Sequence, residues 1–181
     1  MSERRAAAWQ ARANQAYGRT TLALDDEIEA LLAEIAAHPA FASADLRIAP
    51  ASPGKATRLS AFLRAGRGTL YVNLEEACLL CEAPLTSAAE AARALVERGA
   101  ARALVTHGGA PCCDATADGI HTETPPPVTV TRVTGAGDTF AGGVIAALAK
   151  GETDMRAVVE AGHRAAGALL GARQTNLMES A

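Results

Sequence analysis

The 181-residue sequence is poor in aromatic side chains, which make up only 3% of it, although 49% of the residues are hydrophobic. The core must therefore be packed mainly with Ala, Leu and Val. No apolar run approaches the roughly 20 residues that a membrane-spanning helix requires, which excludes an integral helical membrane protein. The length and the hydrophobic share predict one domain with a core of ordinary size.

The sequence also lacks a strong excess of charge of either sign. Its 17 Lys and Arg residues nearly balance 20 Asp and Glu residues, giving a net charge of −3. The basic residues are scattered, and this excludes the concentrated positive surface of a protein that binds a nucleic-acid polymer. We expect no nucleic-acid or membrane partner, and a soluble cytoplasmic protein.

Cysteines are few, and their spacing does not favour a metal centre. They occur as Cys78-x-x-Cys81 and as the adjacent pair Cys112-Cys113. The first pair lies in an apolar helical run, and adjacent cysteines chelate poorly, whereas zinc sites need two well-separated pairs on loops. We expect buried, reduced thiols.

Strand patterns alternate with helical patterns along most of the chain. Short apolar or β-branched runs predict strands at 20–24, 44–49, 69–73, 102–107 and from 128 to the glycine turn at 135, while residues 111–123 resemble a hairpin turning at Asp118-Gly119. Capped amphipathic stretches between and after these runs predict helices. The alternation predicts an α/β fold, a three-layer α/β/α sandwich with a mostly parallel, Rossmann-like sheet.

The most informative stretch is the predicted strand from Val128, its glycine turn and the helix that follows. Gly135 and Gly137 leave the backbone uncrowded, so the amides around Ala136 can point at one anion while the helix N-terminus adds a favourable field. Asp138 then lies in the first helical turn, beside that anion. An ordinary strand-to-helix turn with a capping aspartate is the simpler alternative.

The longer string Val133-Thr-Gly-Ala-Gly-Asp-Thr-Phe-Ala-Gly-Gly143 resembles the C-terminal signature of the PfkB, or ribokinase-like, family of carbohydrate and nucleoside kinases. The resemblance implies that Asp138 is the catalytic base and that the amides of Gly135, Ala136 and Gly137 form the anion hole for the transferred phosphoryl group. Arg132 stands where the family usually has Asp. That departure is similar to the pseudouridine-kinase-like branch, and it makes pseudouridine the first acceptor to test.

Asn73-Leu-Glu-Glu76, at the end of a predicted strand, resembles a second signature of the same family. The resemblance implies that Asn73 and Glu76 help to organise Mg²⁺ and its waters beside the nucleotide phosphates, and that Thr106 and Gly108 lie against the nucleotide. ATP and Mg²⁺ are the cofactors it implies. Taken locally, Asn73 would simply cap the next helix and Glu76 would be an acid in its first turn.

The resemblance covers about residues 20–171, which correspond to the C-terminal portion of a family member. The strands, the glycine-rich acceptor segment and the β lid with which members begin have no counterpart ahead of Thr20. We therefore expect a leader of uncertain structure at 1–19 and a partial, N-terminally truncated ribokinase-like domain at 20–181. Strand edges left bare by such a truncation favour pairing, either as a homodimer or with a missing N-terminal half.

These features predict an ATP-dependent phosphotransferase that acts on an alcohol group of a sugar or nucleoside. The alternative is a non-catalytic remnant that binds the nucleotide or only packs as a structural subunit. A P-loop enzyme is excluded because no Gly-x-x-x-x-Gly-Lys-Ser/Thr string occurs. A dinucleotide oxidoreductase is weaker because the full Gly-x-Gly-x-x-Gly spacing is absent.

Overall fold

The computed structural model describes residues 27–131 and 133–171. Its elements follow the expected alternation. They are a helix at 27–37, the 3₁₀ turn Pro39–Phe41, β1 (Arg47–Ile48), the 3₁₀ helix Pro53–Leu59, α2 (Ser60–Arg64), β2 (Thr69–Asn73), α3 (Leu74–Cys81), α4 (Ala88–Glu97), β3 (Arg102–His107), β4 (Ala110–Thr116), β5 (Gly119–Glu123), α5 (Ala136–Ala149) and α6 (Met155–Gly171).

The five strands form one sheet in the order β1-β2-β3-β4-β5. The pairs β1–β2 and β2–β3 are parallel, whereas β3–β4 and β4–β5 are antiparallel. The predicted hairpin accounts for the β4–β5 pair, which is joined at Asp118-Gly119, whereas the antiparallel pairing of β3 with β4, across the turn at Gly108-Gly109, was not predicted. The sheet is therefore mixed.

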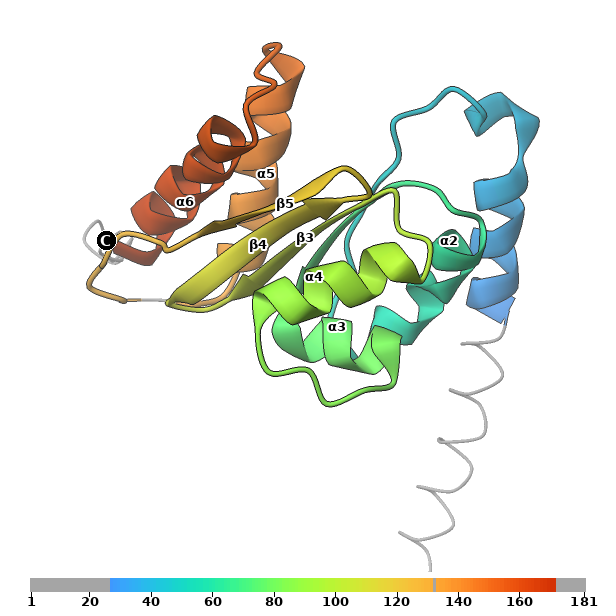
Figure 1. Cartoon of the computed structure of the whole chain (residues 1–181), viewed down its shortest axis with the longest axis horizontal. Coiled ribbons are helices and arrows are strands. Elements are labelled where there is room, and N and C mark those ends of the chain that lie inside the picture. Colours follow the sequence, from blue (N-terminus) through green and yellow to red (C-terminus); the bar gives the residue numbers. More distant parts are fainter. Residues whose placement is uncertain (1–26, 132, 172–181) are drawn as a thin grey trace, which may run out of the picture.

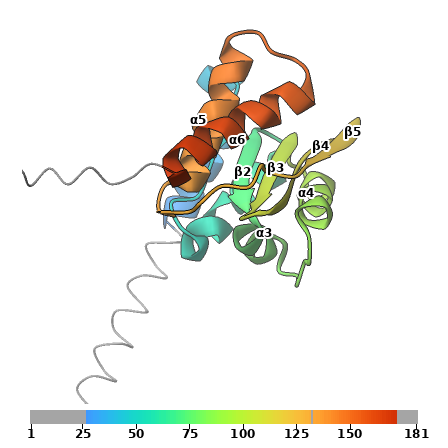
Figure 2. The same cartoon turned by 90° about the vertical axis from the view of Figure 1, so that its left-hand side faces the viewer.

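Helices cover both faces of the sheet, which confirms the three-layer α/β fold (Figures 1 and 2). On one face, α3 and α4 pack with the 53–64 segment over a core of small aliphatic side chains. On the other face, α5 and α6 pack closely together and bury a second, smaller core. The two cores lie on opposite sides of the strands because successive side chains of a strand point to opposite faces.

Local sequence signals set several element boundaries. Ser87 caps α4 by accepting from the Glu90 N–H at 3.2 Å, while the Glu90 carboxylate accepts from the Thr86 N–H at 2.8 Å. Before α2, Pro53 follows Ser52, but the structure forms seven residues of 3₁₀ helix there before the α-helix begins. The predicted strand at 44–49 is shorter than expected, with two residues paired in β1.

The strand expected to lead from Val128 into the glycine turn is wrong for the residues described there. The backbone of 124–131 forms no strand, and the Thr131 N–H donates to the carbonyl of Leu170 at the end of α6, at 2.8 Å. Three prolines at 125–127 lack the N–H that a ladder needs, which explains why the segment leaves the sheet. Its side chains Val128, Val130 and Val133 are exposed.

Some expectations fall outside the described residues. These are the leader at 1–19, the strand at 20–24 and the position of Arg132. All four cysteines are free thiols, with Cys81, Cys112 and Cys113 buried and Cys78 partly so. Among the helices of the described residues, none has the length and apolar character needed to cross a membrane.

Candidate functional site

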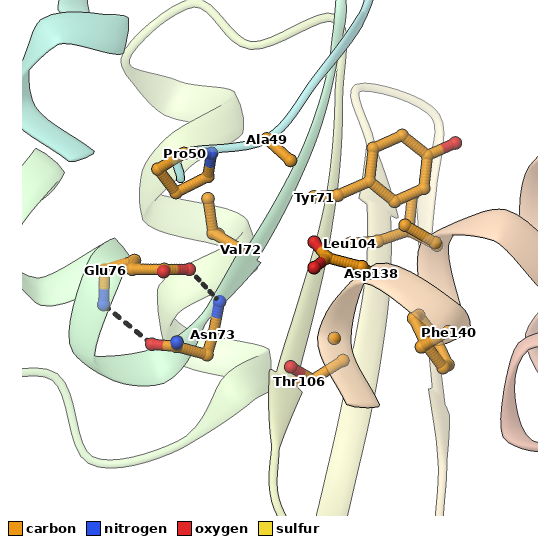
Figure 3. Close-up of a pocket in the computed structure, with 12 residues that line it drawn as sticks. Ala49, Pro50, Tyr71, Val72, Asn73, Glu76, Leu104, Thr106, Asp138 and Phe140 are labelled. Atoms are coloured by element: carbon orange, nitrogen blue, oxygen red, sulfur yellow. Dashed lines mark hydrogen bonds between the residues drawn. The ribbon is translucent and has the colours of Figure 1, made fainter. Parts of the chain in front are cut away.

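A small pocket lies where β2 and β3 end and α5 begins (Figure 3). Its volume is about 90 Å³. Residues from β2, β3, α3 and α5, together with two residues that follow β1, line it: Ala49, Pro50, Tyr71, Val72, Asn73, Glu76, Leu104, Thr106, Gly137, Asp138, Phe140 and Ala141. Five of the residues predicted from the sequence, on three separate segments, thus meet at one edge of the sheet.

Asn73 and Glu76 form one wall of the pocket through a reciprocal capping box at the start of α3. The Asn73 side-chain oxygen accepts from the Glu76 N–H at 2.9 Å, and the Glu76 carboxylate accepts from the Asn73 N–H at 2.8 Å. The local alternative is therefore what the structure contains. It leaves the Asn73 side-chain NH₂ as a donor at the pocket wall, a group better suited to phosphate than to a metal.

Glu76 is a buried carboxylate, only 8% exposed. Burial raises its pKa above the ordinary value, an effect that the Asn73 N–H partly opposes and that the negative charges of Glu75 and Asp138 add to. Both acids line the pocket, and Figure 3 shows their carboxylates directed toward each other. A site with two nearby carboxylates favours a cation.

The N-terminus of α5 forms the opposite wall. Its N-cap, Gly135, has φ 85° and ψ 3°, a left-handed conformation that suits glycine. The Gly135 carbonyl accepts from the Thr139 N–H at 2.9 Å and from its hydroxyl at 2.7 Å, which fixes the first turn. Between the engaged N–H groups of Ala136 and Thr139, those of Gly137 and Asp138 have no helical carbonyl before them to bond and can point at a ligand.

The three amides predicted to form an anion hole are not equivalent. The Ala136 N–H donates to the Val133 carbonyl at 3.1 Å, so it is already engaged, contrary to expectation. Gly137 lines the pocket, and a Cβ placed on it would meet no atom within 4 Å. Gly137 therefore leaves open space at the pocket wall, which a ligand can approach.

Asp138 lies on α5 and is exposed on the pocket side. Figure 3 shows its carboxylate directed from α5 toward β2, below the ring of Tyr71. It faces the same opening as Gly137 and Glu76. A carboxylate in this position can accept a proton from a group bound between the two walls.

The residues predicted on β3 are divided by the structure. Thr106 lines the pocket, next to Asn73 in the parallel register of β2 and β3. Gly108 does not reach it and lies in the exposed β3–β4 turn with φ 57°. The register shifts between Val105 and His107, and this irregularity carries the chain away from the pocket after Thr106.

Two aromatic rings of the pocket were not predicted as part of it. Tyr71 is 6% exposed, and its hydroxyl accepts from the Arg47 guanidinium at 3.0 Å. Phe140 follows Asp138 by two residues and is 5% exposed. Their positions in β2 and α5 indicated burial, but only the packing of α5 on the sheet shows that they share a cavity with the carboxylates.

Metal ligands are sparse in this site. Within residues 27–131 and 133–171, no group of three or more His, Cys, Asp or Glu side chains is arranged to hold an ion. Mg²⁺ keeps most of its water shell and is often bound through one or two carboxylates and substrate phosphates. Glu76, with Asp138 facing it, therefore fits Mg²⁺ held largely through water.

The fold and the pocket together define an α/β protein that presents helix N–H groups and two carboxylates to a phosphoryl-sized opening. The family model of the pfkB family carbohydrate kinases matches residues 3–181. The chain therefore belongs to the pfkB carbohydrate kinase family. No curated protein matches the sequence significantly.

Solved structures of carbohydrate and nucleoside kinases resemble the chain. A carbohydrate kinase from Agrobacterium tumefaciens is 30% identical with a TM-score of 0.61, over 78% of this chain and 43% of that one. Adenosine kinase from Trypanosoma brucei brucei is 25% identical with a TM-score of 0.61, over 70% and 42%. Phosphofructokinase-2 from Escherichia coli in complex with substrates and products is 24% identical with a TM-score of 0.63, over 81% and 47%, and supports the fold alone. The matched regions span less than half of each of these proteins.

Proposed function

We propose that the chain is the nucleotide-binding, catalytic-base half of a PfkB-type kinase, which transfers the γ-phosphoryl group of ATP to an alcohol of a sugar or nucleoside. The observation that carries the proposal is the convergence of Asp138 and the α5 N-terminus with Asn73 and Glu76 at one opening. Family membership supports the reaction class. Residues 20–181 would form the partial kinase domain and residues 1–19 a leader.

The size of the pocket supports a phosphoryl group as the part that it encloses. A cavity of about 90 Å³ holds a few water-sized groups. Pockets that enclose a whole small-molecule ligand are usually larger than ~300 Å³. The nucleoside of ATP and the acceptor would therefore lie outside this opening, against other walls, and the reacting phosphorus inside it.

In the proposed mechanism the chain contributes one base and a set of positioning groups. Asp138 takes the proton of the acceptor hydroxyl as its oxygen attacks phosphorus. The amides of Gly135 and Gly137 hold the developing charge, and the Ala136 amide joins them when it is released from Val133. The bond between the γ-phosphorus and the oxygen that bridges it to the β-phosphate breaks, and ADP leaves. The phosphoryl group is then on the acceptor oxygen and the proton is on Asp138.

The remaining predicted residues would position the nucleotide. The Asn73 side-chain NH₂ and the Thr106 hydroxyl would donate to phosphate oxygens, while Gly108 would contact the nucleotide outside the pocket. Glu76 would orient waters of Mg²⁺, which supplies charge neutralisation between the phosphates when bound. The roles of Asn73, Thr106 and Glu76 fit the donors and acceptors at the opening, whereas the role of Gly108 rests on the family resemblance alone.

Pseudouridine is the first acceptor to test, because Arg132 precedes the motif. Adenosine and fructose 6-phosphate are the alternative acceptors to compare with it in the same assay. The experiment measures transfer of labelled phosphate from ATP to each acceptor and, separately, ATP binding by calorimetry. Transfer to any of them supports the kinase. Binding without transfer favours a remnant or a requirement for a second half, supplied by a homodimer partner or an N-terminal segment. The absence of both ATP binding and phosphoryl transfer would overturn the proposal.

A further inference from the structure

The adjacent cysteines of β4 face opposite sides of the sheet. Cys113 packs in the core beneath α3 and α4, and Cys112 packs in the core beneath α5 and α6. The Cys112 sulfur lies 3.3 Å from Nε2 of His163 on α6, and the two residues are 3% and 8% exposed. This contact joins the sheet directly to α6.

His163 in turn contacts the pocket wall. Its ring centroid lies 5.4 Å from that of Phe140, with the rings inclined by 51°. The neighbouring Gly162 also packs against this ring, since a Cβ on it would lie only 2.7 Å from Cε2 of Phe140. The Phe140 ring is therefore held between α6 and the sheet, and it lines the same pocket as Asp138.

The protonation states keep this arrangement uncharged. Burial raises the pKa of the Cys112 thiol to about 12 and lowers the pKa of His163. The carboxylates of Glu123 on β5 and Glu160 on α6 face His163 and oppose the second shift without reversing it. At neutral pH a protonated thiol thus meets a neutral imidazole, a pair suited to orientation and unsuited to nucleophilic attack.

We propose that the Cys112–His163 contact is a positioning device that fixes the Phe140 ring. Because Phe140, Asp138 and Gly137 all lie in the first turns of α5, fixing this ring also fixes the direction in which the Asp138 side chain and the Gly137 amide point. The inference rests on the proposed function for its catalytic meaning. Its structural content is independent of that function, because Phe140 and Asp138 are two residues apart on one rigid helix. A substitution at Cys112 should therefore change the orientation of Asp138, although the two residues are not in contact in the proposed arrangement.

The chain offers a matched control. Cys112→Ala and Cys113→Ala each remove one buried sulfur from the same strand, but on opposite faces. Both variants should lower the urea midpoint of unfolding to a similar extent. Only Cys112→Ala should shift the backbone amide resonances of Gly137 and Asp138 in the ligand-free chain. It should also weaken tripolyphosphate binding about threefold to tenfold, the range expected when one hydrogen bond between an amide and the phosphate is misaligned.

A second variant tests the same contact from the other side, in case the core repacks around the sulfur that Cys112→Ala removes. His163→Phe keeps a ring against Phe140 but removes the nitrogen that contacts Cys112. It should shift the same two amide resonances, and the double variant should add little to either single change, because both remove one interaction. Additive shifts, or equal shifts in Cys112→Ala and Cys113→Ala, would overturn the inference.

The readouts also separate the inference from the proposed function. If the wild-type chain fails to bind tripolyphosphate, the proposed anion site is wrong, while the amide resonances of the ligand-free variants still decide whether Cys112 and His163 orient α5. If the wild-type chain binds tripolyphosphate and Cys112→Ala leaves both the resonances and the affinity unchanged, the proposed function stands and the positioning role is refuted.

Discussion

Asn73 and Glu76 cap each other at the start of α3, with hydrogen bonds of 2.9 and 2.8 Å between the side chain of each and the N–H of the other. The same pair forms a wall of the candidate active site. A substitution there tests catalysis cleanly only if the replacement preserves the cap, because loss of an N-cap costs about 1 kcal/mol of stability.

Glu76→Gln preserves the cap, since the amide oxygen of Gln can still accept from the Asn73 N–H. Burial holds the pKa of Glu76 above 4.5, so the folded chain binds the proton more tightly than the unfolded chain does. Stability from this group is therefore complete below pH 4.5 and is lost as pH rises through the folded pKa. We expect Glu76→Gln to unfold at higher urea than wild type at pH 7.5, with the advantage disappearing toward pH 4.

The same variant tests the metal role. Mg²⁺ should strengthen ATP binding in the wild type, and Glu76→Gln should reduce that effect by about tenfold or more, as for other groups that orient metal ligands. Calorimetric titrations of ATP with and without Mg²⁺ measure it. An unchanged Mg²⁺ effect would remove Glu76 from the proposed site.

Gly137→Ala should separate stability from binding. A Cβ at 137 meets no atom within 4 Å, so the substitution should stabilise α5 by up to ~1 kcal/mol through helix propensity. It should also weaken tripolyphosphate and ATP binding, because the methyl group occupies the opening. Gly142→Ala, in the same helix and equally free of contacts, is the control and should stabilise without affecting binding. Equal binding by both variants would contradict an anion site at 137.

Asp138→Asn removes the proposed base while keeping the shape of the side chain. We expect phosphoryl transfer to fall by about 10²- to 10⁴-fold, the usual contribution of general base catalysis, while the ATP dissociation constant changes little. Labelled-phosphate transfer and calorimetry on the same preparation measure the two quantities. A parallel loss of transfer and binding would mean that Asp138 has a structural role.

Gly162→Ala tests how tightly α5 and α6 pack. The added methyl group would lie 2.7 Å from the Phe140 ring and 2.8 Å from Cγ2 of Val144. Overpacking of this kind costs about 1–3 kcal/mol, so the urea midpoint should fall. Gly167→Ala on the same helix meets nothing within 4 Å and should leave the midpoint unchanged or raise it. A stable Gly162→Ala variant would show that the two helices can move apart.

Much of the fold was predictable because its signals are local. Thr69–Asn73 and Arg102–His107 are strands with the predicted bounds, and the hairpin turns at Asp118-Gly119. The meeting of Asn73 and Thr106 at one edge followed from the parallel order of β2 and β3. Each of these conclusions needs only the periodicity of a strand or the chemistry of a turn.

The failures have both local and long-range causes. The run from Val128 has the composition of a strand, but the three prolines before it carry the chain out of the sheet, and Thr131 bonds instead to Leu170, 39 positions further along. The engagement of the Ala136 N–H by Val133 depends on the angle at which the loop enters α5. Tyr71 and Phe140 become neighbours of Asp138 only when α5 packs on the sheet. The roles assigned to the site residues stay predictions until the variants above are measured.

Gly135 has a left-handed backbone conformation, whereas Gly137 lies in the helix, and the two positions therefore tolerate different substitutions. At 135 any side chain with a Cβ forces an unfavourable conformation at a cost of about 1–2 kcal/mol, so only Asn and Asp come near to being accepted. At 137 the folded chain itself would accept many residues. A library randomised at both positions and selected first for folding, then for ATP binding, should lose diversity at 135 in the first round and at 137 only in the second.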